Sequence, residues 1–278
     1  MLRRCMALLL MLLLLLPPAF AEEKLPLSAV NADDTFTVYL KQKYHVIAAD
    51  GADKYLYRVQ QGSCTDGRYY YIIKENQKVH DCSVWKLDLE TWEPVDIAFS
   101  LPLGHGNDMT YNPVTNELLA VHYKPERNRI TRLDPDTLQV LGTLEMPYES
   151  FCIGYCRERD QYIIGVADTY QFYITDSEFH VLSYHYGLDT GLITQGVDCD
   201  ENYIYFPMNS KDKKTVVILV YDWDGNYVNT LKLGIFREIE SMSHDGDTWY
   251  IAFNDFGSWV YTATMTEKEG KTVYPWEK

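Results

Sequence analysis

A short polar phrase followed by a strand-forming run recurs along this chain at nearly constant spacing. The five lead residues of the phrase are separated by 44, 44, 46 and 45 positions. A period of about 40–50 residues is the size of one four-stranded blade of a β-propeller. Four near-equal steps therefore predict five blades. The lead residues are Gln61, His105, Glu149, Gln195 and Glu240.

The interior of each repeat has the pattern of antiparallel strands. Turn pairs such as Asp66-Gly67, Asn112-Pro113 and Asp245-Gly246 separate runs in which β-branched and aromatic residues alternate with polar ones. Such runs between turn residues are typical of strands. No window beyond the N-terminal segment has helical periodicity. The sequence therefore predicts an all-β fold, a five-bladed β-propeller.

The last repeat lacks a clear outer strand. Residues 35–40 have the composition of a strand, and we predict that this N-terminal strand closes the last blade, which would remove a sheet edge. One β-propeller domain over residues 35–278 follows, preceded by a flexible mature N-terminus at 22–34. A six-bladed ring is the competing architecture, but it needs a full blade before residue 61, where the chain is short and irregular.

The N-terminal segment has the features of a signal peptide. Arg3 and Arg4 precede the apolar run 7–16, and Ala19-Phe20-Ala21 has the small-x-small pattern of a cleavage site. We predict a signal peptide over residues 1–21 and a secreted or extracytoplasmic protein. A retained anchor is the alternative. The run is shorter than the roughly 20 residues that span a bilayer, so we expect no stable membrane insertion.

Charge and cysteine content restrict the partners. The net charge of −15 repels phosphate backbones, so we expect no nucleic acid partner, whereas cations, neutral sugars and basic peptides remain compatible. We expect a monomer, in which an odd number of cysteines leaves at least one thiol unpaired. Buried free thiols and a disulfide framework both remain open. The cysteines after the signal are Cys64, Cys82, Cys152, Cys156 and Cys199.

The lead residues indicate where a site would lie. The innermost strand of each propeller blade lines the central channel, so equivalent lead positions should form a ring on one face. All five are polar, which favours a solvated mouth with converging hydrogen-bonding groups, because burying unpaired polar groups costs about 1–3 kcal/mol each. The alternative is that they bond neighbouring blades together, particularly Gln61 and Gln195, each of which precedes glycine.

Three lead residues depart from the Gln-Gly phrase and are the predicted catalytic residues: His105, Glu149 and Glu240. Two carboxylates close together raise one pKa, which can supply an acid and a base. With Glu238, the same groups could hold a divalent cation through oxygen ligands and one imidazole. The predicted ligand-binding residues are Gln61, His105, Asn107, Asp108, Gln195, Glu238 and Glu240.

Motifs of familiar enzyme classes are missing from the sequence. It has no Gly-rich phosphate loop, no G-x-S-x-G elbow and no H-E-x-x-H helix. Most of the abundant aromatic residues are expected to fill the space between blades. We therefore expect a secreted propeller that binds a small molecule, glycan or peptide at the channel mouth. An enzyme with Glu149, Glu240 and His105 as acid, base or metal ligands is the alternative.

Two short motifs resemble known families. Ile193-Thr194-Gln195-Gly196 resembles the Phe-Thr-Gln-Gly motif of glutamine cyclotransferases, which implies a secreted five-bladed propeller that cyclises N-terminal glutamine. The last two repeats resemble the C-terminal part of helveticin-J-like bacteriocins, which implies action on neighbouring cells. The second resemblance is carried by Gln195-Gly196-Val197-Asp198, Ile204-Tyr205 and Glu238-Ile239-Glu240-Ser241.

Overall fold

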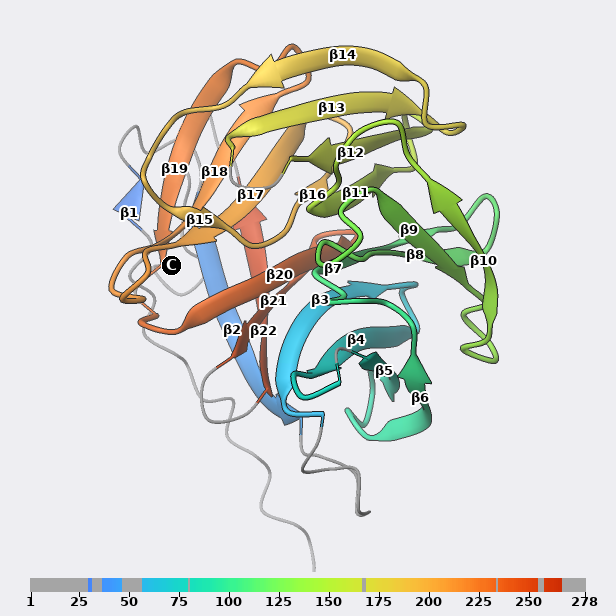
Figure 1. The fold of residues 1–278 in the computed structure, drawn as a ribbon. Helices are drawn as coiled ribbons and strands as arrows, with labels where there is room; N and C mark the ends of the chain where they lie inside the picture. The colour runs from blue at the N-terminus through green and yellow to red at the C-terminus, as the bar shows by residue number, and fades with distance from the viewer. Residues whose placement is uncertain are drawn as a thin grey trace, which may run out of the picture.

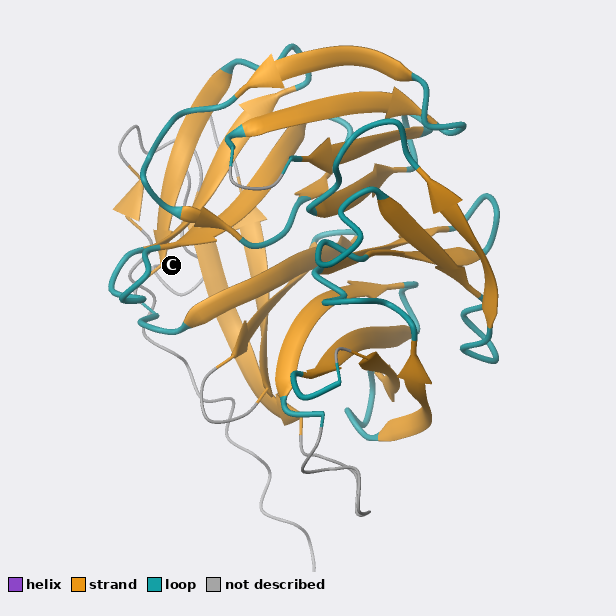
Figure 2. Cartoon of the chain, viewed as in Figure 1, coloured by secondary structure: helices purple, strands orange, loops and turns teal. Residues whose placement is uncertain are grey.

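The computed structural model describes residues 30–31, 37–46, 57–79, 81–166, 169–233, 235–254 and 258–266. The predicted signal peptide and most of the predicted flexible start, residues 22–34, lie outside this part of the chain. The described residues contain strands and loops, and their five sheets fan out around a common centre (Figures 1 and 2). None of these residues belongs to a helix long and apolar enough to cross a membrane.

Each sheet is one propeller blade of antiparallel strands, which confirms the predicted five-bladed β-propeller. Blade 1 contains β3 (Val59–Thr65), β4 (Tyr69–Asn76), β5 (Asp81–Asp88) and β6 (Pro94–Leu101). Blade 2 contains β7 (Asp108–Asn112), β8 (Glu117–Val121), β9 (Arg129–Leu133) and β10 (Val140–Glu145). Blade 3 contains β11 (Cys152–Cys156), β12 (Gln161–Gly165), β13 (Gln171–Asp176) and β14 (Val181–Tyr186).

The last two blades include strands from the N-terminal part of the chain. Blade 4 contains β15 (Ile193–Thr194), β16 (Asp198–Cys199), β17 (Tyr203–Asn209), β18 (Val216–Asp222) and β19 (Tyr227–Leu233), with β1 (Val30–Asn31) paired to β19. Blade 5 contains β20 (Glu238–Asp245), β21 (Thr248–Asn254) and β22 (Ser258–Thr266), and β2 (Thr37–Val46) is its outer strand. The predicted closure of the last blade by an N-terminal strand is therefore confirmed, and the addition of β1 to blade 4 was not predicted.

The core lies between neighbouring blades. Successive side chains of a strand point to opposite faces, and here both faces are covered. In blade 1, for example, Ile73 and Val84 pack with Met109 of blade 2. Ile72 and Trp85 pack on the other face, in a cluster that includes residues of blade 5. Because each blade is buried on both sides, its strands are rich in apolar and aromatic residues.

The inner strands of the blades meet at the axis. A Cβ added to Gly62 of blade 1 would lie 2.3 Å from the Cα of Asp108 in blade 2. The Asp108 carboxylate accepts hydrogen bonds from the backbone N–H groups of Ile153 (3.1 Å) in blade 3 and Val197 (3.1 Å) in blade 4. Hydroxyls of Ser63 and Ser241 connect blades 1 and 5. We call these six residues the axial hub.

We predict that Gly62→Ala destabilises the protein by about 3 kcal/mol or more, because the added methyl group overlaps backbone that cannot move without opening the hub. Gly142→Ala is the matched control, since a Cβ there would meet no atom within 4 Å, and its effect should stay within about 0.5 kcal/mol. Urea unfolding measures both variants. Equal unfolding midpoints for the two variants would contradict the close approach at the axis.

Candidate functional site

A cavity of about 390 Å³ opens where the inner strands begin, on the face that carries the lead residues. We call it the leading cavity. Blades 2, 3, 4 and 5 all contribute to it through residues at or before the starts of their inner strands and through neighbouring loops. Its lining consists of His105, Asn107, Tyr123, Phe151, Thr169, Tyr170, Leu192, Ile193, Thr194, Gln195 and Glu238.

His105 is held in place by the backbone of its own loop. Gly104 and Gly106 on either side have φ values of 61° and 64°, which favour glycine. The His105 N–H donates to the carbonyl oxygens of His122 (3.1 Å) and Lys124 (3.0 Å). A side chain on Gly104 would also collide with the Lys124 carbonyl, at 2.6 Å. The loop therefore presents the imidazole to the cavity in one position.

The His105 imidazole also has a buried carboxylate partner. Its Nδ1 lies 3.1 Å from Oε2 of Glu75, whose side chain is 2% exposed, against 29% for His105. A carboxylate this close to Nδ1 restricts the orientations that the imidazole can adopt. Because Glu75 belongs to β4 of blade 1, this pair brings the remaining blade to the cavity.

The two predicted glutamates of blade 5 occupy different environments. Glu238 lines the cavity, and its Oε2 accepts a hydrogen bond of 2.7 Å from Lys213. Glu240 is 4% exposed and lies at a register shift in the pairing of β20 with β21. Burial, helped by the charge of Glu238, raises the pKa of Glu240 well above its usual range, while a hydrogen bond with Asn254 opposes this shift.

Asn107 and Gln195 are joined across the cavity wall. Asn107 Nδ2 donates to the carbonyl oxygens of Phe151 (2.9 Å) and Gln195 (3.4 Å). Gln195 Nε2 donates to Oδ1 of Asn209 at 3.3 Å. The side-chain oxygens of Asn107 and Gln195 accept no hydrogen bond from any residue that the structure describes. Within the described part of the chain, both oxygens can therefore accept a hydrogen bond from a ligand.

Aromatic residues form the apolar side of the cavity. Tyr123 packs edge-on against Phe151, with ring centroids 4.8 Å apart, and lies beside His105 at 5.9 Å. Its φ of 62° is uncommon for a residue with a side chain, and such conformations concentrate at functional sites. Tyr170 donates its hydroxyl to the Leu192 carbonyl at 3.2 Å. These contacts fix the rings before any ligand arrives.

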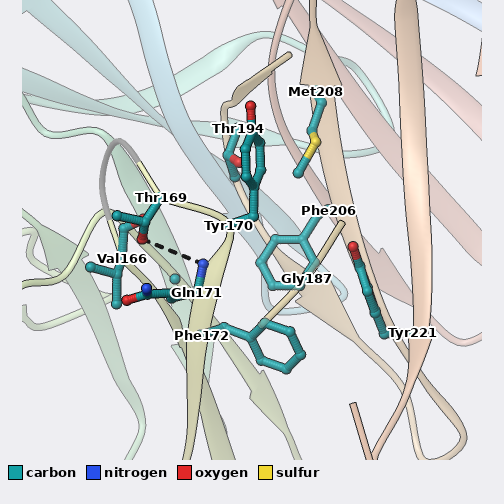
Figure 3. A pocket seen from close by; sticks show the side chains of 11 residues that line it. Val166, Thr169, Tyr170, Gln171, Phe172, Gly187, Thr194, Phe206, Met208 and Tyr221 are labelled. Atoms are coloured by element: carbon teal, nitrogen blue, oxygen red, sulfur yellow. Dashed lines mark hydrogen bonds between the residues drawn. The ribbon is translucent and has the colours of Figure 1, made fainter. Parts of the chain in front are cut away.

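A narrow cleft between blades 3 and 4 adjoins the leading cavity through Thr169, Tyr170 and Thr194. Figure 3 shows these residues with Phe206 and Met208 around it, and the Gln171 N–H donating to Thr169 Oγ1 at 3.4 Å. The cleft has a volume of about 10 Å³, which is room for one water molecule at most. It therefore extends the wall of the cavity and is not a second ligand site.

Four predicted site residues do not line the leading cavity, and the buried Glu240 is one of them. Gln61 is buried in β3, at a register shift in its pairing with β4. Asp108 belongs to the axial hub, where its Oδ1 also accepts from the Met109 N–H at 2.9 Å. Glu149 is exposed and pairs with Arg127 at 3.3 Å. The structure thus brings together His105, Asn107, Gln195 and Glu238, with Glu240 buried.

The opposite face of the ring also has cavities, of about 240 and 400 Å³, where the inner strands end. We call the smaller one, which all five blades line, the trailing cavity. Two of the aspartates around these cavities serve their own hairpins. Asp66 accepts from the N–H groups of Arg68 and Tyr69 and from the Tyr71 hydroxyl. Asp200 makes the equivalent three bonds in blade 4. Repetition between blades indicates a structural role, which makes the leading cavity the better candidate.

The described residues contain no group of three or more His, Cys, Asp and Glu side chains arranged to hold a metal ion. His105 has one carboxylate partner, and Glu238 is paired with a lysine ammonium group.

No protein-family model and no curated protein matches the chain. Among solved structures, a duf4221 family member from Bacteroides vulgatus is similar, with a TM-score of 0.52 and 9% identity over 85% of this chain and 100% of that chain. For hydrazine synthase of Kuenenia stuttgartiensis, the TM-score is 0.46 and the identity is 12%. That match covers 78% of this chain and 65% of the synthase chain. For a streptogramin B lyase, the TM-score is 0.47 and the identity is 12%, and the match covers 79% of this chain and 67% of the lyase chain. At these identities the similarity concerns the fold alone.

Several residues of the cavity were not predicted from the sequence. Glu75 lies at the end of a strand that reads as core, and Lys213 lies in a hairpin loop. Tyr123, Tyr170 and Leu192 come from loops outside the repeated phrase. The glycines on both sides of His105 were the one local signal, since they indicate a constrained backbone around a polar side chain.

We predict that Asp108→Asn lowers stability by about 1–3 kcal/mol, because both carboxylate oxygens accept backbone N–H groups and an amide NH₂ cannot replace either of them. Burial raises the pKa of Asp108 well above its usual range, and the three N–H groups oppose that shift. Asp247→Asn, on an exposed hairpin, is the control. Thermal unfolding at neutral pH compares the two, and an unchanged melting temperature for Asp108→Asn would exclude the hub role.

Proposed function

We propose that this protein is a ligand-binding propeller that holds a small organic molecule, or the end of a peptide, in the leading cavity. The observation that carries the proposal is a cavity of about 390 Å³ with aromatic and aliphatic residues on one side and His105, Asn107, Gln195 and Glu238 on the other. Ligand sites combine an apolar lining with a few oriented polar groups in this way. The loop around His105 and the packed rings supply the rigidity that reduces the entropic cost of binding.

The unused polar atoms indicate the class of ligand. Among the described residues, no donor reaches the side-chain oxygens of Asn107 and Gln195 or the second carboxylate oxygen of Glu238. Both N–H groups of Asn107 Nδ2 already donate to carbonyls. An excess of acceptors next to a carboxylate favours a ligand with several N–H donors, such as an ammonium or amide group attached to an apolar body. The net charge of −15 also favours a cation.

We further propose that binding occurs outside the cytoplasm, because Arg3, Arg4 and the apolar run 7–16 have the pattern of an export signal. A glycan is a weaker candidate for the same cavity, since its hydroxyl groups would find donors and acceptors but no charge complement to Glu238. The only support for an activity of the glutamine cyclotransferase or helveticin-J type is the resemblance of the short sequence motifs.

Acid–base catalysis is the second candidate function, favoured by the His105–Glu75 pair. A histidine oriented by a buried carboxylate is the arrangement that enzymes use for a general base. Glu238 would supply a second carboxylate at the cavity, whereas the predicted Glu149 lies outside it and Glu240 is buried. An increase in the rate of hydrolysis or cyclisation of a bound amide, abolished by both His105→Gln and Glu75→Gln, would favour the enzyme.

We predict that phenethylamine binds to the protein and that phenylacetate, which has the same ring and the opposite charge, does not. His105→Ala and Glu238→Gln should each weaken amine binding about tenfold, or about 1.4 kcal/mol. Isothermal titration calorimetry measures the affinities. Glu149→Gln is the matched control, because Glu149 is also paired with a single base but lies outside the cavity. Equal losses for Glu149→Gln and Glu238→Gln, or no preference for the amine over the acid, would contradict the proposal.

A further inference from the structure

Two of the five cysteines in the described residues come from neighbouring blades and meet. All five are free thiols with buried side chains. Cys156 is the last residue of β11 in blade 3, and Cys199 is the last residue of β16 in blade 4. The Cys156 and Cys199 thiols interact with each other, and the Cys156 thiol also donates to Oε2 of Glu158 at 3.7 Å. No other pair of these cysteines is recorded in contact within the described part of the chain.

The alternation of side chains explains why these two thiols face each other. In β11, Cys152 and Cys156 point into the cluster shared with blade 4, whereas Ile153 and Tyr155 point to the cluster shared with blade 2. Cys199 belongs to the same blade 3–blade 4 cluster. The residue before it, Asp198, points the other way and pairs with His244 of blade 5 at 2.8 Å.

The backbones of the two strands are in contact just before the cysteines. A Cβ added to Gly154 would lie 3.1 Å from the Val197 carbonyl oxygen and 3.3 Å from the Asp198 Cα. Both inner strands run toward the trailing cavity, so the residues after Gly154 and the residues after Asp198 advance together along the axis of the ring. Cys156 and Cys199 follow within two residues on facing sides. Two strands whose backbones approach this closely can bring nearby cysteines within the distance that a disulfide spans.

The surroundings of the pair suit thiol–disulfide exchange. The hydrogen bond from Cys199 lowers the pKa of Cys156, while burial raises the pKa of Cys199 well above its usual range. A thiolate is the attacking species in exchange, so Cys156 is the better first nucleophile. Cys199 lines the trailing cavity, of about 240 Å³, which gives this side of the pair a route to solvent.

We propose that Cys156 and Cys199 are a disulfide-forming pair that joins blades 3 and 4 when the protein meets a small disulfide such as oxidised glutathione. During refolding, before blades 3 and 4 close over the pair, the Cys156 thiolate attacks one sulfur of oxidised glutathione, forms a mixed disulfide and releases one glutathione thiolate. The Cys199 thiolate then attacks the Cys156 sulfur and releases the second glutathione. The pair loses two protons and two electrons, and one oxidised glutathione becomes two reduced molecules.

The remaining cysteines do not fit this role. Cys152 lies in the same strand and cluster, but it is four residues before Cys156, or about 13 Å away along a strand that rises about 3.3 Å per residue. Cys64 and Cys82 belong to the cluster between blades 1 and 2, on β3 and β5, with β4 between them. The proposed bond therefore leaves these three thiols free, in agreement with the odd cysteine count.

The proposed bond joins two strands whose other ends carry wall residues of the leading cavity. The proposal does not depend on ligand binding in that cavity. Phe151 precedes β11 and Gln195 precedes β16, and both line that cavity. A covalent bond at the trailing ends of these strands would restrain the two blades whose leading ends carry the wall. Oxidation should therefore stabilise blades 3 and 4 against separation.

The test is to refold the protein with oxidised and reduced glutathione, unfold it, alkylate it with N-ethylmaleimide and map the peptides by mass spectrometry. We expect two thiols to be protected in the oxidised sample and a single cross-linked peptide pair containing Cys156 and Cys199. Cys199→Ser should instead retain glutathione on Cys156. Cys152→Ser is the matched control and should form the bond as the unaltered protein does.

A stability measurement complements the mapping. The melting temperature of the oxidised protein should exceed that of the reduced protein by several degrees, and this difference should disappear in Cys199→Ser but remain in Cys152→Ser. Complete alkylation of all cysteines after oxidation, or a cross-link between a different pair, would overturn the proposal. So would glutathione on Cys152 and not on Cys156 in the Cys199→Ser variant.

Discussion

The fold depends on the Asp108 carboxylate at the axis of the ring. It accepts N–H groups from the inner strands of two other blades, in a place where Gly62 allows the strand of blade 1 to touch its backbone. A buried polar group must be fully bonded to be tolerated, so this arrangement admits one mutual position of four blades. Propeller blades otherwise meet through apolar contacts, which are much less specific about register. The hub therefore determines where the five leading ends lie relative to one another.

The two faces of the ring differ in how closely the blades repeat one another. The hairpin aspartates Asp66 and Asp200 repeat the same three bonds at the trailing ends, as a structural repeat does. At the leading ends the repeat is broken, and His105 lies beside Glu75 of blade 1 and Tyr123 of its own blade, which packs in turn on Phe151 of blade 3. Rigid placement of a few acceptors beside an apolar wall is what recognition of an amine requires. One ring thus separates a face built for stability from a face suited to binding.

The spacing of the lead residues was sufficient to predict the number of blades and that these residues gather at one end of the ring, because equivalent positions of a repeat recur around the axis. It was not sufficient to predict which lead side chains reach the cavity. Register shifts in β3 and β20 bury Gln61 and Glu240, and Glu149 lies on an exposed loop beside Arg127. Tyr123, Tyr170 and Leu192 come from loops between strands, which carry no periodic signal. The partnership of His105 with Glu75 is a contact between blades that no local pattern encodes.

We propose that the leading cavity receives an amine through His105 and Glu238. A crystal structure of the protein with phenethylamine is the direct test of this proposal. We expect the ammonium group within hydrogen-bond distance of the Glu238 carboxylate and the phenyl ring against Tyr123, Phe151 or Tyr170. Phenethylamine in the trailing cavity, with the leading cavity free of it, would contradict the proposed site.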